Sequence, residues 1–214
     1  MASAANNAEV FLSQALAGSQ EGFGRLLSLY RNYLKLLVVA QLEQPLRRRV
    51  SPSDVVQETF LEANRDFDQF RGRSAGEFCA WLRRILVNNI HRAIEQHALA
   101  AKRSVHREVS LDALATSLEQ STVRLEAILA GSLDSPSESL QRQEQQLDLA
   151  NRLAALPRDY RDVILLRHMH GLPFEEIGRR MDRSAGAARM VWLRAIRHLR
   201  ETMNPASEAV GETP

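Results

Sequence analysis

The stretch LPFEEIGRRMDRSAGAARMVWLRAIRHLRE, residues 172–201, decides the fold class of the C-terminal part of the chain. Pro173 can open a short helix, and Asp182 with Arg183 can make the turn that ends it. The hydroxyl of Ser184 can then cap a second, longer helix by accepting a bond from a free backbone donor. The inward face of that longer helix is expected to be apolar, at three- and four-residue spacing: Ala188, Val191, Ala195 and Leu199. The pattern predicts a helix-turn-helix.

The opposite face of the longer helix is small at its start and bears arginine further along: Gly186, Arg189, Met190, Leu193 and Arg197. A helix with such a face can enter the major groove of DNA and approach the base edges. Three more arginines crowd the turn, where DNA phosphates would lie: Arg179, Arg180 and Arg183. An amphipathic helical hairpin with a solvated arginine face has the same pattern, so both interpretations stand on this stretch alone.

Helical spacing of the apolar residues extends through the rest of the chain. In the N-terminal part it covers three ranges: 23–37, 55–67 and 78–94. Either Ser53 or Asp54 is the expected cap of the middle helix. In the C-terminal part, helices are expected at about 147–156, 160–168, 174–181 and 184–203. Because runs of β-branched residues are scarce and no segment alternates as a strand does, we predict an all-α protein.

Charge is arranged in blocks, although the net charge of the whole chain is only +2. The blocks alternate in sign: −4 over residues 50–70, +6 over 71–107, −6 over 108–151 and +4 over 158–203. Two basic segments separated by an acidic one predict two binding sites for a polyanion, joined by a segment that avoids it. All but two of the 28 basic residues are arginine, which suits phosphate and base recognition but is also expected of a GC-rich genome.

The acidic segment between the basic ones has the weakest folding signal. Residues 117–144 are rich in Ser, Gln and Glu and contain Gly131 and Pro136. We predict a flexible linker with weak local structure, in which the stretch LEAIL makes at most a brief helix. The predicted architecture is two small helical domains joined by this linker and followed by a disordered tail: domain 9–107, linker 108–146, helix-turn-helix domain 147–203 and tail 204–214.

A second candidate nucleic-acid site lies in residues 67–103, FDQFRGRSAGEFCAWLRRILVNNIHRAIEQHALAAKR. A loop containing Gly and Ser, 72–76, precedes a helix that bears a set of polar residues: Arg83, Arg84, Asn88, Asn89 and Arg92. Small side chains and loop backbone can admit an unstacked base while neighbouring arginines hold phosphates. The aromatic residues of this segment can stack on bases, although core packing is the commoner role for each of them: Phe67, Phe70, Phe78 and Trp81.

The helix before this segment has an acidic side, to which four residues contribute: Asp54, Gln57, Glu58 and Glu62. DNA would repel that side, because both carry negative charge. It is therefore either a solvated face or a docking surface for a basic protein partner.

Other residues exclude several kinds of function. A single cysteine, Cys79, rules out an intramolecular disulfide and a Cys-rich zinc site, and a packing role is expected for it. The six histidines lack metal-ligand spacing, and no phosphate loop or nucleophile motif occurs, so we predict no metal, no cofactor and no enzymatic activity. Arg31, Asn32 and Lys35 interrupt the most apolar stretch, 26–42, and no signal peptide opens the chain. We therefore expect a cytoplasmic protein without membrane insertion.

Three of these segments together resemble the sigma-70 family of bacterial sigma factors, in its extracytoplasmic-function group, which retains only regions two and four. DVVQETFLEA (54–63) resembles the helix of that family that binds core RNA polymerase. FRGRSAGEFCAWLRRILVNN (70–89) resembles its promoter-melting segment, which reads the minus-ten element, and residues 153–201 resemble region four with the helix that reads the minus-thirty-five element. The resemblance covers residues 20–107 and 147–203. It implies a protein that binds core RNA polymerase and promoter DNA to direct initiation.

The resemblance also implies roles for individual residues. One set would contact the clamp helices of the polymerase's largest subunit: Asp54, Gln57 and Glu58. In the loop 72–76, a flipped base of the minus-ten element would be held by Gly72, Arg73 and Ser74. The melted strand would be followed by Arg84, Asn88 and Arg92. The minus-thirty-five element would be met by Arg189, Met190, Leu193 and Arg194. Three residues at the turn, predicted from their position rather than from the resemblance, complete the DNA-binding set: Arg179, Arg183 and Ser184.

The chain departs from the family's pattern at two places. Many relatives have an acidic residue where this chain has His91–Arg92, which leaves the base contacts of the minus-ten helix open. Ala188 replaces a common valine in the last helix. The resemblance also leaves room for an anti-sigma factor as a further partner.

Two other functions compete on the residues alone. A helix-turn-helix regulator that binds duplex DNA without acting as a polymerase subunit accounts for the C-terminal part equally well. It leaves the DVVQE and RGRSAG segments unexplained, and binding to core polymerase separates the two hypotheses. A helical scaffold with solvated arginines is the other alternative. The charge blocks argue against it, and a salt-dependent DNA-binding assay decides it.

Overall fold

The computed structural model describes residues 4–42, 49–100, 110–130 and 139–203. Within these ranges the chain forms helices joined by turns and short connections, with no strand, which confirms the predicted all-α class. The N-terminal helices are α1 (Ala4–Leu16), α2 (Gln20–Gln41), α4 (Pro52–Asp66), the short 3-10 helix η1 (Phe67–Gln69) and α5 (Ala75–Ala100). The middle helices are α6 (Leu111–Ala130) and α7 (Ser139–Ala155). The C-terminal helices are α8 (Arg158–Ile164), the π-helical turn η2 (Leu165–Met169), α9 (Phe174–Arg180) and α10 (Ala185–Met203).

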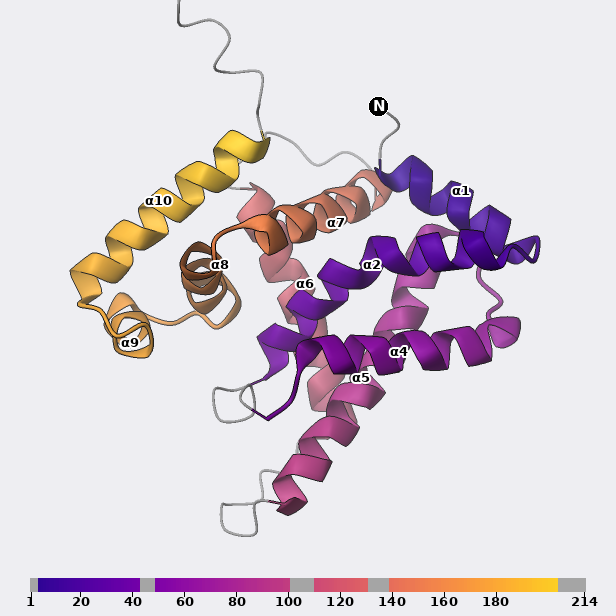
Figure 1. The fold of residues 1–214 in the computed structure, drawn as a ribbon, viewed down its shortest axis with the longest axis horizontal. Coiled ribbons are helices and arrows are strands. Elements are labelled where there is room, and N and C mark those ends of the chain that lie inside the picture. Colours follow the sequence, from indigo (N-terminus) through magenta and orange to yellow (C-terminus); the bar gives the residue numbers. More distant parts are fainter. Residues whose placement is uncertain (1–3, 43–48, 101–109, 131–138, 204–214) are drawn as a thin grey trace, which may run out of the picture.

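Helix α2 is the centre of the N-terminal bundle, with α1, α4 and α5 packed around it (Figure 1). It buries ten of its 22 residues, and those with no exposed surface include Leu26, Tyr30, Leu34 and Leu37. This is the apolar stripe that the three- and four-residue spacing predicted. Helices α4 and α5 pack on this buried core, and their outer faces point away from it.

The start of α4 differs from the prediction. Ser51, rather than Ser53 or Asp54, is the N-cap, and its hydroxyl accepts a hydrogen bond from the backbone N–H of Asp54 at 3.3 Å. Pro52 explains the shift, because proline has no N–H to lose at the first helical position and its φ suits a helix. Asp54 thus lies in the first turn, where its charge also favours the helix dipole.

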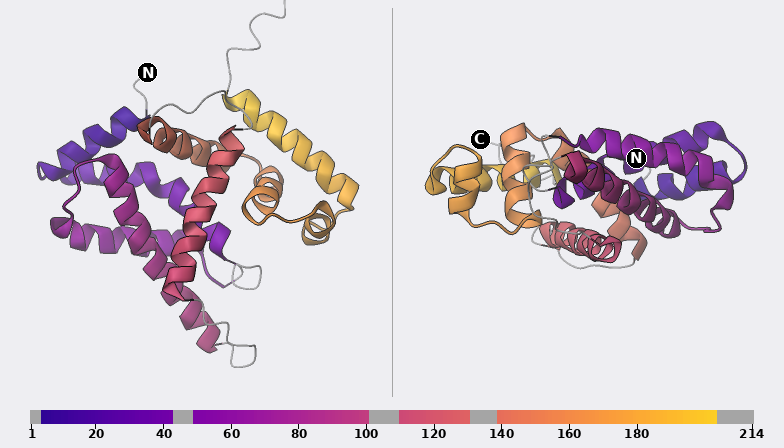
Figure 2. Two further views of the ribbon diagram at one scale, coloured as in Figure 1. Left: turned by 180° about the vertical axis from the view of Figure 1, so that it is seen from behind. Right: turned by 90° about the horizontal axis from the view of Figure 1, so that it is seen from below.

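The segment between the two predicted domains contains much more helix than the sequence indicated. Helix α6 is 20 residues long and lies across α2 and α5 (Figure 2). It buries Leu114 and Leu118 together with Ser121 and Thr122. The two hydroxyls are satisfied because each donates to a carbonyl one turn back, to Ser117 at 3.0 Å and to Leu118 at 3.1 Å. The polar composition of this segment therefore did not predict its helix, because buried Ser and Thr hydroxyls can donate to backbone carbonyls of their own helix.

Helix α7 also begins earlier than the predicted residue 147, and it packs against α1 and α2. Asn32 of α2 donates to the side-chain oxygen of Asn151 at 2.8 Å. Gln143 reaches the N-terminal bundle too, where its amide donates to the hydroxyl of Tyr30 at 2.8 Å. The predicted linker therefore overlaps two packed helices. The predicted domain limit at 107 and the predicted tail, 204–214, lie outside the described residues.

The C-terminal helices form the predicted helix-turn-helix. Met181 donates its N–H to the carbonyl of Ile177, and Arg183 donates to that of Gly178 at 2.8 Å. Asp182 between them has φ 55°, the left-handed conformation that aspartate tolerates better than most residues. The buried stripe of α10 is the predicted one: Ala188, Val191, Ala195 and Leu199.

We expect Gly178→Ala to destabilise the helix-turn-helix by about 1–3 kcal/mol, the usual cost of forcing extra volume into a packed site. A β-carbon at residue 178 would lie 2.7 Å from the carbonyl oxygen of Arg183 and 3.0 Å from the carbonyl carbon of Ser184. Both are backbone atoms of the turn, so the turn itself must move. Chemical denaturation of the whole chain, followed by circular dichroism, measures the loss.

Gly186→Ala is the matched control for this prediction. Nothing lies within 4 Å of a β-carbon at residue 186, and alanine is the better helix former by about 1 kcal/mol at most. Its unfolding midpoint should stay equal to that of the wild type or rise. Equal stability of the two glycine variants would mean that the turn does not have this tight geometry.

Candidate functional site

The first candidate surface is the outward face of α4. Asp54, Gln57 and Glu58 are all exposed there, and Leu61 stands beside them with 56% of its surface exposed. The inner face of the same helix is buried: Val55, Val56, Thr59, Phe60 and Ala63. One rigid helix thus presents two carboxylates, an amide and an apolar side chain to a partner.

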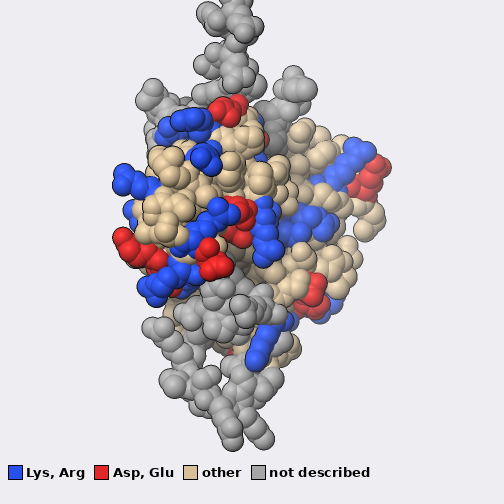
Figure 3. All heavy atoms as spheres, turned by 60° about the vertical axis from the view of Figure 1, so that its left-hand side comes forward, with Lys and Arg blue, Asp and Glu red and all other residues tan. Residues whose placement is uncertain are grey.

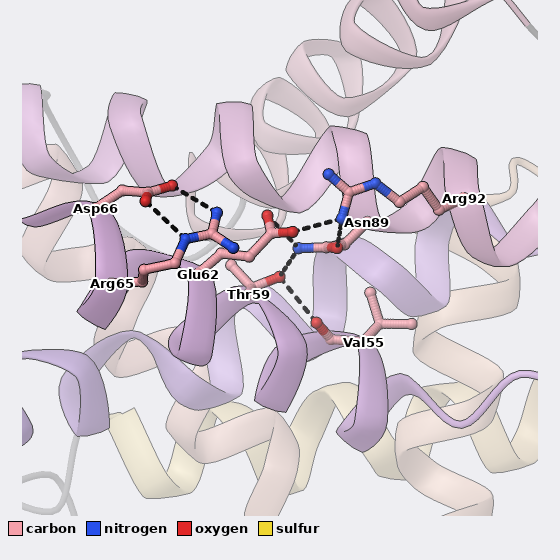
Figure 4. Close-up of polar contacts among 7 residues, drawn as sticks. All are labelled: Val55, Thr59, Glu62, Arg65, Asp66, Asn89 and Arg92. Carbon is pink, nitrogen blue, oxygen red and sulfur yellow. Dashed lines mark hydrogen bonds and ion pairs between the residues drawn. The ribbon is translucent and has the colours of Figure 1, made fainter.

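Glu62 does not belong to this outward face, contrary to the sequence analysis. Its side chain is only 12% exposed and turns toward α5, where Arg92 donates to one of its carboxylate oxygens (Figure 4). The other oxygen accepts a bond from the amide of Asn89 at 3.2 Å. Sequence spacing placed Glu62 one turn beyond Glu58, but it could not show that the helix edge meets α5 at that point.

The second candidate surface is the loop before α5. The loop is shorter than predicted, because Ala75 and Gly76 already belong to the first turn of the helix. Ser74 and Glu77 form a capping box there: the Ser74 hydroxyl accepts from the N–H of Glu77 at 3.3 Å, and the Glu77 carboxylate accepts from the N–H of Ser74 at 3.1 Å. The sequence SAGE carries this signal, and the sequence analysis missed it.

The carboxylate of Glu77 also organises the rest of the loop. It accepts a hydrogen bond from the N–H of Arg73 at 2.8 Å, and these bonds hold the pKa of Glu77 below its usual value. Gly72 lies against the ring of Phe70, which a β-carbon would approach to 2.4 Å. The glycine is therefore required by packing, while the Arg73 side chain is free to point into solvent.

Contacts from three other helices, α1, α2 and α7, fix the base of the loop. The N–H of Ala75 donates to the Glu9 carboxylate of α1 at 2.9 Å. The carbonyl of Ala75 accepts from the hydroxyl of Tyr30 at 3.2 Å and from the amide of Gln143 at 3.0 Å. No local pattern indicates Glu9 or Gln143 as supports of the loop, because both come from remote parts of the chain.

The aromatic residues around the loop form one cluster. Phe70 and Phe78 are buried, so core packing rather than base stacking is their role. Phe67 and Trp81 are half-buried at its edge, with ring centroids 6.3 Å apart. The cluster braces the loop against α2 through Phe23, whose centroid lies 4.3 Å from that of Phe67.

The outer stripe of α5 carries Arg84 and Asn88, which are both exposed as predicted for a nucleic-acid contact. Arg83 faces the other way, into the contact with α2, where it donates to the hydroxyl of Tyr33 at 3.5 Å. Arg92 is 54% exposed, but its guanidinium is paired with Glu62 of α4. The structure thus joins Arg92 to a residue that the sequence analysis assigned to a different surface.

The third candidate surface is the free face of α10. Arg189, Met190, Leu193 and Arg194 are all exposed, and the two apolar members expose 50% and 44% of their surface. Basic side chains are spread over this side of the molecule, with acidic and uncharged ones between them (Figure 3). Exposed apolar and cationic groups on one helix face suit contact with base edges and phosphates.

The turn before α10 is also as predicted in position, although its arginines are paired. Arg179, with 77% of its side chain exposed, contacts Glu176 at 2.6 Å, and the partly buried Glu176 also pairs with Arg180 at 2.9 Å. Arg183 contacts Asp159 at 2.5 Å, and both of these residues are exposed. The hydroxyl of Ser184 accepts from the N–H of Ala187 at 3.1 Å, which makes it the helix cap. Such exposed pairs are weak, so a phosphate can replace the carboxylate partner of either arginine.

Two family models match the parts of the chain that carry the three candidate surfaces. Residues 22–99 match the family model for Sigma-70 region 2, and residues 146–199 match the model for Sigma-70, region 4. The chain is 30% identical to the ECF RNA polymerase sigma-E factor of Haemophilus influenzae over 203 residues, covering 92% of this chain and 98% of that protein. It is also 30% identical to the ECF RNA polymerase sigma-E factor of Escherichia coli over 201 residues, covering 92% and 94%. The chain belongs to the sigma-70 family, in its extracytoplasmic-function group.

As a sigma factor, it directs promoter-specific transcription initiation, and the alternative of a separate helix-turn-helix regulator is not favoured. The region 2 match spans α2, α4 and nearly all of α5, which carry the first two surfaces. The region 4 match begins in α7 and ends near the close of α10. Among the helices described, none combines the length and the apolar character needed to cross a membrane.

Proposed function

We propose that this sigma factor binds the clamp helices of the largest subunit of core RNA polymerase through the outward face of α4. Asp54, Gln57 and Glu58 are exposed together on a helix whose other side is buried, and this arrangement is the observation that carries the proposal. Charge-assisted bonds to basic residues would give orientation, and Leu61 would add apolar contact at the centre.

The loop before α5 and the outer stripe of α5 are the proposed minus-ten surface. The carboxylate of Glu77 already occupies the N–H groups of Arg73 and Ser74, so these amides do not offer a phosphate site. A base of the melted strand would instead meet the exposed side of the loop at Arg73, while Arg84 and Asn88 remain exposed for the strand.

The free face of α10 is the proposed minus-thirty-five surface. Met190 and Leu193 lie between Arg189 and Arg194, so the face can contact thymine methyl groups as well as guanine edges. Arg179, at the end of α9, would hold a phosphate and set the angle of entry.

Reading both elements requires the two halves to separate. Elements centred at minus ten and minus thirty-five lie about 25 base pairs, or about 85 Å, apart along the duplex. Here Gln143 of α7 bonds Ala75 beside the minus-ten loop, and Arg152 of α7 bonds the carbonyl of Thr202 in α10. Since α7 and α10 laid end to end would reach only about 55 Å, we propose that α7 leaves α2 on the promoter.

The sigma factor is proposed to act by binding alone, in the cytoplasm, where polymerase and promoter DNA meet. It needs no cofactor for this, because its role is to place and open DNA on an enzyme that supplies the chemistry. We propose an anti-sigma factor as a further partner. It would compete with core polymerase and promoter DNA for the same exposed surfaces.

Reconstituted transcription tests the proposal directly. The purified chain, mixed with core RNA polymerase, should comigrate with it on gel filtration and direct transcripts from a subset of a promoter library. Core polymerase alone, and core with a chain truncated after residue 145, are the controls. Binding to duplex promoter DNA without any association with polymerase would instead identify a separate regulator.

A further inference from the structure

A closed network of polar side chains joins α4 to α5 (Figure 4). The buried amide of Asn89 donates to the Glu62 carboxylate at 3.2 Å and toward the hydroxyl of Thr59 at 3.4 Å. Its oxygen accepts from the guanidinium of Arg92 at 3.2 Å, and the same guanidinium nitrogen donates to Glu62. Thr59 in turn donates to the carbonyl of Val55 at 2.8 Å.

Breaking this network costs free energy, because its central polar groups are buried. Asn89 exposes 4% of its surface and Thr59 none, so neither can turn to water when a partner is lost. A buried polar group without a partner loses the hydrogen bonds that water would supply in the unfolded chain. Apolar packing alone would allow α5 to slide or rotate slightly, whereas these directional bonds fix its rotation against α4.

We infer that Glu62 and Arg92 are positioning residues. Their ion pair, called the tie below, holds α4, the proposed polymerase-docking helix, against α5, the helix proposed to follow the melted strand. Arg92 then acts through Glu62 and Asn89 rather than by contacting DNA itself, which replaces the role that the sequence resemblance implied for it. The tie sets the direction of Arg84 and Asn88, the exposed residues on the same helix. The inference rests on the proposed function of α5.

The position of Arg92 supports this assignment. It lies one turn beyond Asn88 and two turns beyond Arg84, so a helix stripe alone would send all three side chains toward the strand. Arg84 and Asn88 do point outward, but Arg92 leans to α4, where its partner Glu62 is only 12% exposed. A phosphate would have to compete with a carboxylate that is already in place and partly desolvated.

Exchanging the charges of Glu62 and Arg92 distinguishes an Arg92 that acts by pairing with Glu62 from one that contacts DNA. Glu62→Arg and Arg92→Glu each place like charges together beside Asn89. Each should lower the rate of open-complex formation about tenfold, a typical coupling for contacting residues. In the double variant Glu62→Arg/Arg92→Glu the pair is restored in reverse, and the Asn89 amide can flip to serve both partners. We expect open-complex formation to return to within about threefold of wild type, with the minus-ten base preference and the salt dependence unchanged.

The opposite outcome overturns the inference. If the double variant regains wild-type stability and polymerase binding, but opens promoters as slowly as Arg92→Glu, then Arg92 touches the strand. Arg92→Gln provides a second test should a reversed variant not fold, because the amide can still donate to Glu62 but carries no charge. Near-normal opening with an unchanged salt slope supports the tie, whereas a slope reduced by about one indicates a lost phosphate contact.

Variants of the exposed residues distinguish failure of this inference from failure of the proposed function. Arg84→Ala and Asn88→Ala should each impair opening in an assay where polymerase binding is unaffected. If neither variant changes opening, α5 does not follow the strand, and the proposed minus-ten surface fails regardless of the swap. If both impair it while the swap fails to rescue, only the tie is wrong.

Discussion

Reversing the charges of Asp54 and Glu58 is expected to weaken binding to core RNA polymerase roughly 100-fold or more. Like charges placed across an interface cost several kcal/mol, and about 1.4 kcal/mol corresponds to each tenfold change. Both side chains are exposed on the outer face of α4, so lysine at either position meets no buried group and the fold should survive. Fluorescence anisotropy of the labelled sigma factor, titrated with core polymerase at fixed salt, measures the change.

The control must carry the same change in net charge elsewhere. Glu21 and Asp112 are exposed acids, each in the first turn of its helix, as Asp54 is in α4. Glu21→Lys/Asp112→Lys therefore has a similar small cost in helix stability and the same gain in charge. It should bind polymerase nearly as the wild type does. If the two double variants lost affinity equally, bulk charge rather than the α4 face would govern binding.

The sequence predicted best what depends on local periodicity. The stripe of Ala188, Val191, Ala195 and Leu199 is buried as expected, and the arginine of residue 189 lies on the free face. A helix repeats every 3.6 residues whatever surrounds it, so the inward and outward faces follow from spacing alone. The cap at Ser184 was predictable for the same reason, because it depends on residues within one turn.

Two other local features were available in the sequence and were missed. The capping box of Ser74 and Glu77 moves the start of α5 into the predicted loop, and Pro52 moves the cap of α4 back to Ser51. Both signals are short patterns with a known mechanism. The capping box alone alters which backbone groups of the loop before α5 are free for a ligand.

The remaining differences depend on contacts between distant parts of the chain. Helix α6 packs on α2 and α5, and the residues it buries there include Ser121 and Thr122, which are typical of a linker when the sequence is considered alone. The bond from Gln143 to the carbonyl of Ala75 joins residues 68 positions apart. The pair of Glu62 and Arg92 spans 30 positions, and each side chain taken alone fits an exposed functional face.

Helix α7 packs through both polar and apolar contacts. The bond between Asn32 and Asn151 is exposed, and that between Gln143 and Tyr30 is only partly buried. Water can replace such hydrogen bonds if α7 leaves α2 on the promoter, as proposed above. Helix α7 also buries apolar side chains, and any that release exposes would oppose the movement: Leu147, Leu149 and Leu153.

Arg189→Ala is expected to reduce initiation mainly at promoters that carry the preferred upstream element, by roughly 5- to 150-fold. A bidentate arginine–guanine contact is worth about 1–3 kcal/mol of discrimination, which corresponds to that range. Arg189 lies in the second turn of α10, beyond Ala185 and Gly186, and nothing crowds the helix at Gly186. The start of the helix can therefore approach the groove closely enough for the exposed guanidinium to reach a base edge.

Arg179→Ala is the control variant for this prediction, because it should lose a phosphate contact rather than a base contact. Arg179 is 77% exposed at the end of α9 and pairs with Glu176, so it is placed to contact a phosphate rather than a base. Its loss should weaken binding at all promoters alike and lower the salt dependence of binding by about one unit of slope. Promoter activity across an upstream-element library, measured for both variants, separates the two roles. The assignment of α10 is wrong if Arg189→Ala leaves the sequence preference unchanged, or if Arg179→Ala alters that preference more strongly.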